Sequence, residues 1–124
     1  MANALYDKGR EGFLDGTIDY DTNTIKAALI DKDFYTFSAS HQFLTSVAAS
    51  ARAGTATALT SRTVTNGVAG AANTTFVSVT AGTTVGAVIL FKDTGSSGTS
   101  NLICYINQIR IQRYSSNLAQ ASTT

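Results

Sequence analysis

The longest apolar, β-branched run in the chain spans residues 85–92, with the sequence VGAVILFK. Eight residues are few for a helix and suit a strand that is buried on both faces. Residues 93–100 follow with Asp, Thr, Gly and Ser, which favour loops, and residues 102–106 form a second apolar run. We therefore predict two antiparallel strands joined by a long loop, with the rest of the chain organised around them.

Near the N-terminus, a helix is predicted from Asn3, which can cap it, to about Leu14. Gly9 and Gly12 lie inside this segment, and each is about 1 kcal/mol less favourable than Ala in a helix unless tight packing requires it. The dipeptide at residues 15–16, Asp-Gly, is a turn signal and ends the helix. We therefore expect this helix to need a partner surface, either its own core or another protein.

Several shorter segments also have the residue pattern of strands. Residues 17–20 alternate in polarity, residues 21–24 are turn residues and residues 25–30 are apolar, which predicts an early hairpin. Residues 34–49 mix aromatic and small polar residues, and we expect a loop there with a short helical turn near residues 41–47.

The Asn66-Gly67 dipeptide is the strongest short-range hairpin signal in the chain, and it ends a predicted strand over residues 59–65. Residues 74–79 predict another strand, with Phe76 or Val77 facing inward. Short strands with a turn about every ten residues are typical of a β-sandwich or a small barrel.

The end of the chain has two parts. Residues 109–114 alternate between apolar and polar, which predicts a half-exposed strand, and residues 115–124 are small and polar, which predicts a tail. With 124 residues, the chain is long enough for one domain and short for two. We therefore expect a single, mainly β domain over residues 1–124, with a short N-terminal helix in residues 1–14 and an extended C-terminal tail.

Charged residues make up only 14% of the chain and apolar residues 44%. A surface this poor in charge suits a chain that packs against other protein, or equally a small sandwich covered by Thr and Ser. Residues 1–33 hold seven of the eight acidic residues against four basic ones, a net charge of −3, and residues 34–124 carry +4. This asymmetry could let the acidic end of one copy meet the basic end of another. No basic cluster interleaved with aromatic residues points to nucleic acid.

Candidate chemistry is sparse. Residues 19–23, DYDTN, resemble the start of a calcium loop, but Thr24 stands where Gly is expected and Ile30 where the bidentate Glu is expected. A turn closed by Asp and Asn side chains is the alternative. His41 is the one histidine and Cys104 the one cysteine, too few for a zinc site, and Cys104 is expected to be a buried, inert thiol. We predict no catalytic residue, metal or cofactor.

The N-terminus lacks the basic and apolar regions of a signal peptide, and no run reaches the roughly 18 apolar residues of a membrane span. We therefore expect a soluble protein that is not exported and has no membrane partner.

Three segments of the chain resemble a family of small virion proteins encoded by tailed bacteriophages. The opening, LYDKGREGFLDGTI at residues 5–18 and TIKAALID at 24–31, is similar to the start of that family. TVTNGV at residues 63–68 is similar to its central turn. KDTG at residues 92–95 and TSNLICYI at 99–106 are similar to its closing hairpin. The order and spacing of the three carry the resemblance.

The resemblance implies a structural component of the phage particle with no catalytic residues. Within that class we favour a capsid cement (decoration) protein that binds the major capsid protein on the head, as a homo-oligomer and preferably a trimer. A neck, tail or fibre-attachment subunit is the alternative. The family usually continues past the closing hairpin with a Trp-containing strand, whereas residues 108–124 here are short and lack Trp.

A carbohydrate-binding or hydrolytic domain is a third hypothesis, since Phe34, Tyr35 and Phe37 cluster in the sequence and aromatic rings stack on sugars. The other aromatic candidates are Tyr6, Tyr20, Tyr105 and Tyr114. Only Asp31 and Asp33 lie near the cluster, and glycoside hydrolysis needs two placed carboxylates.

If the chain is a cement subunit, we expect its contacts on the N-terminal helix and on the chain from residue 108 onward. Leu5 and Phe13 would be apolar anchors, with Gly9 and Gly12 allowing close approach. Arg10, Arg110 and Arg113 would bind acidic surface, and Tyr114 begins the tail. The alternative is that the helix simply covers the core of its own domain.

Overall fold

The computed structural model describes residues 4–72, 74–77, 85–106, 110–114 and 118–122, and its centre is the predicted hairpin. Strand β7 (Val85–Lys92) pairs antiparallel with β8 (Asn101–Ile106), with a register shift between Leu90 and Phe91. Ala87, Val88, Ile89 and Phe91 are buried, so β7 has protein on both faces, as its uninterrupted apolar sequence predicts.

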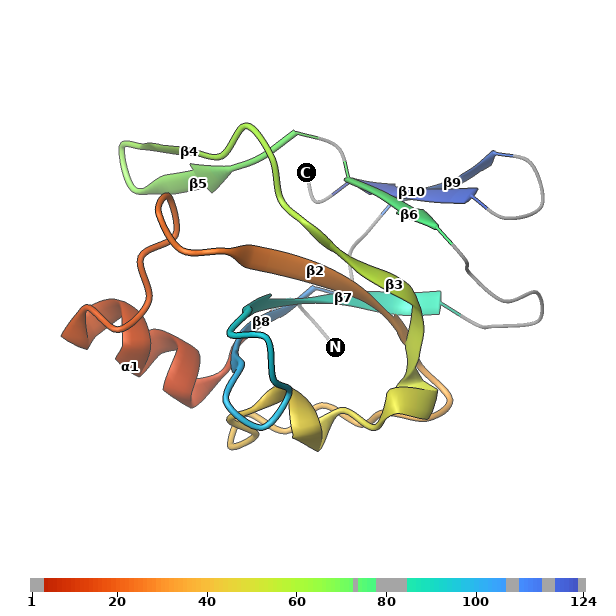
Figure 1. The fold of residues 1–124 in the computed structure, drawn as a ribbon, viewed down its shortest axis with the longest axis horizontal. Helices are drawn as coiled ribbons and strands as arrows, with labels where there is room; N and C mark the ends of the chain where they lie inside the picture. The colour runs from red at the N-terminus through yellow and green to blue at the C-terminus, as the bar shows by residue number, and fades with distance from the viewer. Residues whose placement is uncertain (1–3, 73, 78–84, 107–109, 115–117, 123–124) are drawn as a thin grey trace.

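A five-stranded antiparallel sheet forms around this hairpin, in the order β1-β8-β7-β2-β3 (Figure 1). Strand β2 (Ile25–Asp31) pairs with β7 on one side and with β3 (Arg52–Ala58) on the other. The prediction of a strand over residues 25–30 is therefore confirmed. The predicted partner strand over residues 17–20 is wrong, because these residues have no strand structure and lead into a turn that hydrogen bonds between Asp19 and Asn23 close.

The N-terminal segment begins with a short strand, β1 (Ala4–Leu5), and continues with helix α1 (Asp7–Asp15). The expected start of the helix, Asn3, lies outside the described residues. Ala4 and Leu5 pair with Tyr105 and Cys104 at the free edge of β8, so the chain is still extended at these positions and the helix begins only after Tyr6. The helix ends at Gly16, whose φ of 84° is the left-handed conformation common after a helix.

One face of the main sheet is covered by the segment between β2 and β3. This segment contains two short 3₁₀ helices, η1 (Leu44–Ser46) and η2 (Ala49–Ala51), and the first lies within the predicted helical turn. The core on this face combines residues from the sheet, from the covering segment and from the start of α1. Its buried members are Tyr6, Ala28, Ile30, Tyr35, Leu44, Val47, Ala51, Ala87, Ile89, Phe91, Leu102 and Tyr105.

On the opposite face lies a second, three-stranded sheet in the order β6-β10-β9. Strand β6 (Thr74–Val77) contacts β3, and Phe76 packs against Ala27, Leu29, Ala53 and Val88 of the main sheet. Phe76 is completely buried, so the prediction that Phe76 or Val77 faces inward is confirmed for Phe76. The chain is thus mainly β with antiparallel sheets packed together, as predicted for a small β-sandwich.

The C-terminal segment differs from the prediction. Residues 110–114 form the expected strand, β9 (Arg110–Tyr114), but Leu118–Ser122 is strand β10 and not an extended tail. Strand β10 pairs with β6 on one side and with β9 on the other, so its backbone is bonded along both edges. Backbone pairing of this kind does not need large apolar side chains, which is why a segment of mainly small residues, LAQAS, can form the middle strand.

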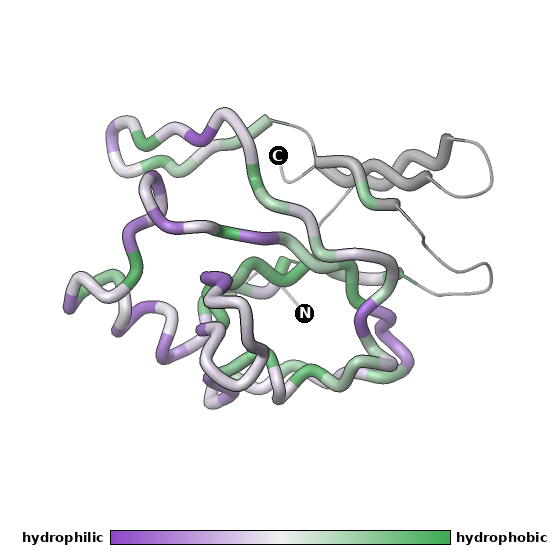
Figure 2. The backbone as a smooth tube through the Cα atoms, viewed as in Figure 1, coloured by the Kyte–Doolittle hydropathy of each residue, from purple (hydrophilic) through white to green (hydrophobic). Residues whose placement is uncertain are grey.

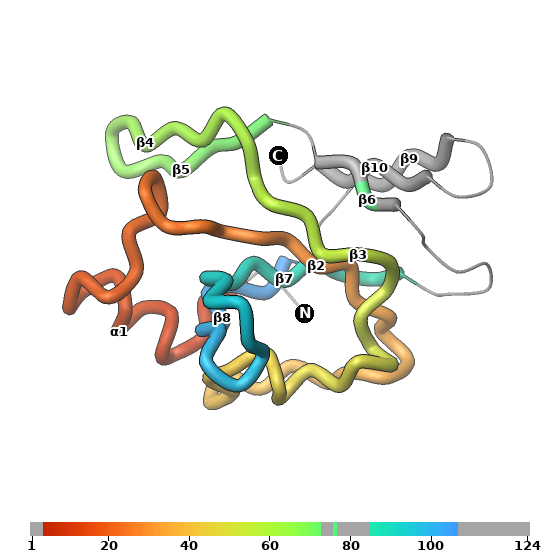
Figure 3. Tube along the Cα trace, in the orientation of Figure 1, coloured from red at the N-terminus to blue at the C-terminus, as the bar shows by residue number. Residues whose placement is uncertain are grey.

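Between β3 and β6 the chain forms a separate hairpin of β4 (Thr63–Thr65) and β5 (Val68–Gly70) (Figure 3). It turns at Asn66 and Gly67, both with positive φ, as the Asn-Gly signal predicts. Within the described ranges, no helix is long and apolar enough to cross a membrane.

Candidate interaction surface

Helix α1 lies directly on strand β8, and its two buried glycines make this contact possible. A Cβ added at Gly9 would lie 2.4 Å from the backbone oxygen of Ile103, and one added at Gly12 would lie 2.5 Å from Cδ1 of Ile18. The N–H of Tyr6 donates to the same Ile103 oxygen at 3.0 Å. The glycines therefore serve close packing inside the chain, which corrects the expectation that Gly9 and Gly12 would let a partner approach.

Three other residues predicted for the interface lie on the surface. Leu5 and Phe13 are each 40% exposed, and the neighbouring Leu14 is 88% exposed. Arg10 is also exposed, but its guanidinium already donates to a carboxylate oxygen of Asp7 at 2.5 Å and to the Leu5 carbonyl at 3.2 Å. Leu5, Phe13 and Leu14 thus leave apolar surface on the N-terminal segment, while the charge of Arg10 is largely balanced within the helix.

The predicted C-terminal contacts are Arg110, Arg113 and Tyr114, and all three lie in β9. Strand β9 is the outer strand of its sheet, and their side chains lie outside what the structure describes. In Figure 1, α1 and β9 lie at opposite ends of the molecule. The structure therefore does not bring the two predicted groups together into one surface.

The β4–β5 hairpin is a surface that the sequence prediction missed. Val64 is 55% exposed and Val68 is 66% exposed. In the antiparallel register Val64 stands opposite Ala69, and Val68 stands opposite Thr65. Figure 2 shows apolar segments along this hairpin, which projects at the same end of the molecule as the end of α1. An Asn-Gly turn flanked by two valines, with no charged residue from 63 to 70, was the available signal.

The base of this hairpin is attached to the turn that precedes β2. The Tyr20 hydroxyl donates to the Gly70 carbonyl at 2.9 Å. The Arg62 guanidinium donates to the carbonyls of Tyr20 and Asn23, and its Cζ lies 5.9 Å from the centre of the Tyr20 ring. These contacts bind only the base, so the two strands beyond them remain exposed to solvent.

The turn itself is the segment that resembles a calcium loop. The Asn23 side chain accepts from the N–H of Asp19 at 2.7 Å, and the N–H of Asn23 donates to the Asp19 carbonyl at 2.9 Å. This is the side-chain-closed turn that the sequence offered as the alternative. Asp21 hydrogen-bonds to Asp19, which lowers the pKa of Asp19, while that bond and the charge of Asp19 raise the pKa of Asp21.

Among the described residues, no cluster of three or more His, Cys, Asp or Glu side chains could hold a metal ion.

The aromatic residues considered for sugar stacking lie mostly in the core. The Tyr35 hydroxyl lies 2.7 Å from the Tyr6 hydroxyl and 2.8 Å from Nδ1 of His41. The Phe37 ring packs 5.0 Å from the Tyr6 ring and 5.1 Å from the Tyr105 ring, measured between centres. Burial raises the pKa of Tyr6 strongly, and its hydrogen bond with Tyr35 adds to the rise. These rings therefore form an internal cluster and not an exposed platform.

Phe34 is the exception among these aromatic residues, since it is 63% exposed. Cys104 lies on β8 and is half-buried, so the prediction of a buried side chain is wrong. Desolvation still raises the pKa of its thiol to about 12, which keeps the sulfur protonated.

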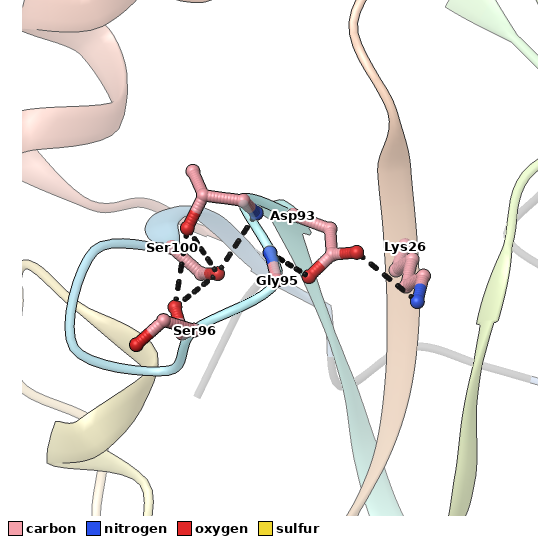
Figure 4. A network of polar contacts seen from close by, with 6 residues as sticks. Lys26, Asp93, Gly95, Ser96 and Ser100 are labelled. Atoms are coloured by element: carbon pink, nitrogen blue, oxygen red, sulfur yellow. Dashed lines mark hydrogen bonds and ion pairs between the residues drawn. The ribbon is translucent and has the colours of Figure 1, made fainter.

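The loop between β7 and β8 is held by a network of polar contacts (Figure 4). Lys26 of β2 forms an ion pair with Asp93 at 3.1 Å, and Asp93 also accepts from the N–H of Gly95 at 3.2 Å. Within the loop, the Ser100 hydroxyl donates to the Ser96 carbonyl at 2.7 Å. Burial raises the pKa of Asp93, but the bonds from Lys26 and Gly95 outweigh it and leave the pKa below its usual value.

Comparisons of the chain with protein-family models, with curated proteins and with solved structures give no match.

Proposed function

We propose that the chain is a non-enzymatic structural protein of a phage virion, and within that class a capsid cement (decoration) protein. The observation that carries the proposal is the large apolar side chains left on the surface of a small, charge-poor domain: Leu5, Phe13, Leu14, Phe34, Val64 and Val68. Three of these side chains belong to the N-terminal segment and two to the β4–β5 hairpin, and apolar surface exposed on a few elements supports a protein that works bound to other proteins. The resemblance of residues 5–31, 63–68 and 92–106 to small virion proteins supports the same class.

A cement protein of this size acts through many weak contacts. Each copy would bind the major capsid protein, and a trimer would bind several capsid subunits at once, so that avidity replaces high affinity at each contact. Closed symmetric oligomers are the usual form of such assemblies. A mass measurement by light scattering is expected to give a trimer, and a monomer at micromolar concentration would contradict the proposed trimer.

Mass spectrometry of purified particles from the phage that carries the gene tests the location. A cement protein is expected in many copies and in separated heads, and deletion of its gene is expected to leave viable, heat-sensitive particles. About six or twelve copies, as expected for a ring on symmetry grounds, would instead indicate a neck, tail or fibre-attachment subunit. Absence of the chain from purified particles would contradict both virion functions.

Carbohydrate binding receives less support than a virion role. The Phe34, Tyr35 and Phe37 cluster is not a stacking surface, because Tyr35 is buried and Phe37 packs against core rings. A glycan array tests carbohydrate binding directly, and glycan binding at high micromolar concentration would support that function.

A further inference from the structure

The β4–β5 hairpin exposes apolar side chains on both of its faces. Neighbouring residues of a strand point to opposite faces, so Val64 and its partner Ala69 lie on one face, and Val68 and its partner Thr65 lie on the other. No residue from 63 to 70 carries a charge. Within the part of the chain that the structure describes, β4 and β5 pair only with each other, so each also has an open edge.

The base of the hairpin carries an excess of negative charge. Asp19 and Asp21 lie in the turn that holds the base, and both are exposed. Arg62 is the nearby cation, but its guanidinium is already committed to two backbone carbonyls and to the Tyr20 ring. Neither Asp19 nor Asp21 forms an ion pair with another described residue. An apolar surface therefore stands beside two adjacent carboxylates and one internal guanidinium.

We propose that the β4–β5 hairpin is a docking arm for a partner protein whose surface is apolar at the centre of the contact and carries Lys or Arg beside it. The inference rests on the proposed virion function and identifies which part of the chain makes the contact. The valines supply the apolar contact, the open strand edges can accept backbone hydrogen bonds, and Asp19 with Asp21 attract the basic rim.

Charge complementarity favours a different protein over a second copy of this chain. Two copies joined hairpin to hairpin about a two-fold axis would bring two sets of Asp19 and Asp21 toward each other, and such like charges oppose association. The exposed apolar residues away from the arm are Phe34 and, on the N-terminal segment, Leu5, Phe13 and Leu14. Beside Phe34, Lys32 and Asp33 cancel in charge, and the two cations of α1, Lys8 and Arg10, are paired with Glu11 and Asp7. Among the side chains that the structure describes, a second copy therefore offers no apolar surface beside an excess of positive charge.

The first test is co-sedimentation of the purified full chain with heads and with tails from particles that lack the gene. The double variant Val64→Thr with Val68→Thr keeps the β-branched shape but replaces a methyl with a hydroxyl on each side chain. We expect at least about ten-fold weaker binding. Phe34→Ser is the matched control, because it removes a large exposed apolar side chain outside the arm, and it is expected to bind as wild type.

The second test removes the negative charge. Asp19→Asn with Asp21→Asn keeps side chains that can hydrogen-bond in the turn, and it is expected to bind more slowly and to lose much of the salt dependence of binding. Asp33→Asn is the control, because it removes one exposed carboxylate away from the arm. Circular dichroism spectra and melting temperatures of all variants would establish that the fold is retained.

The outcomes distinguish a failure of the docking-arm proposal from a failure of the proposed virion function. If wild type binds neither heads nor tails, the virion function fails and the arm proposal falls with it. If wild type binds and the valine variant binds equally well, the arm is overturned while the function stands. If light scattering shows that the valine variant loses an oligomer present in wild type, the occupant is a second copy and the proposal of a basic partner is overturned.

Discussion

Replacing Gly9 by alanine tests whether α1 belongs to the core of this domain. At an exposed helix position this change usually stabilises a protein by about 1 kcal/mol, because glycine is a poor helix former. Here the added methyl would lie 2.4 Å from the Ile103 backbone oxygen and 3.0 Å from its Cα. The obstacle is backbone in a paired strand, so the helix itself must move away from β8. We therefore expect Gly9→Ala to destabilise the protein, the opposite of its usual effect in a helix.

The size of the effect follows from three contributions. Overpacking typically destabilises by about 1 to 3 kcal/mol. Movement of the helix would also weaken the 3.0 Å hydrogen bond from Tyr6 to Ile103, which contributes about 1 kcal/mol. The higher helix propensity of alanine offsets about 1 kcal/mol of this destabilisation. The free energy of unfolding of Gly9→Ala should therefore fall by about 2 kcal/mol.

Gly12→Ala is the matched comparison, because it makes the same change one turn later in the same helix. Its methyl would meet Cδ1 and Cγ1 of the Ile18 side chain at 2.5 and 2.7 Å, and a side chain can change rotamer for about 1 kcal/mol. The gain in helix propensity offsets that cost, so this variant should lie within about 0.5 kcal/mol of wild type.

Urea unfolding followed by circular dichroism measures both variants. A difference of about 2 kcal/mol between them corresponds to about 8 °C in melting temperature at this chain length. A Gly9→Ala variant as stable as Gly12→Ala, or more stable than wild type, would refute the packing of α1 on β8. The helix would then be available to a partner, as the sequence alone allowed.

Two further substitutions and one reactivity measurement test other parts of the structure. Because the folded-state pKa of Asp93 is lowered, its ion pair with Lys26 stabilises the fold above the unfolded pKa, near 4, and is lost as pH falls through the folded value. Asp93→Asn should therefore lower stability by up to about 1 kcal/mol at pH 7, and the difference from wild type should shrink as the pH falls through the lowered pKa of Asp93. Half-buried Cys104, with a pKa of about 12, should react with a thiol reagent at pH 8 at least about 100-fold more slowly when folded than in urea, and equal rates would contradict the desolvation of its thiol. Phe76→Ala should destabilise by about 3 to 5 kcal/mol in urea unfolding, and a loss below about 1 kcal/mol would mean that β6 does not pack on the main sheet.

The elements that the sequence predicted correctly are those whose signal is local. The run at residues 85–92 is apolar at nearly every position, and that pattern suits only a strand covered on both faces. Asn66-Gly67 specifies its turn by backbone conformation alone. Asp15-Gly16 likewise ends α1 at a glycine with positive φ.

The features that were missed depend on contacts far apart in the sequence. Ala4 and Leu5 are extended because the edge of β8 lies beside them, some 100 residues later in the chain. Strand β10, LAQAS, has no β-branched or aromatic residue, and it forms because β6 and β9 are available on either side. The role of Gly9 was ambiguous for the same reason, since a glycine in a helix indicates a close neighbour but not whether the neighbour is the same chain.

The way the core is built places the exposed β4–β5 hairpin outside the covered faces of the main sheet. Both faces of the main sheet are covered by the chain itself, one by the segment between β2 and β3 and the other by β6. An isolated two-stranded hairpin has marginal stability in water. The β4–β5 hairpin is fixed at one end by the Asn66-Gly67 turn and at its base by the hydrogen bonds of Arg62. A partner that docks on this hairpin meets a preformed surface, so less of the binding free energy is lost in ordering the chain.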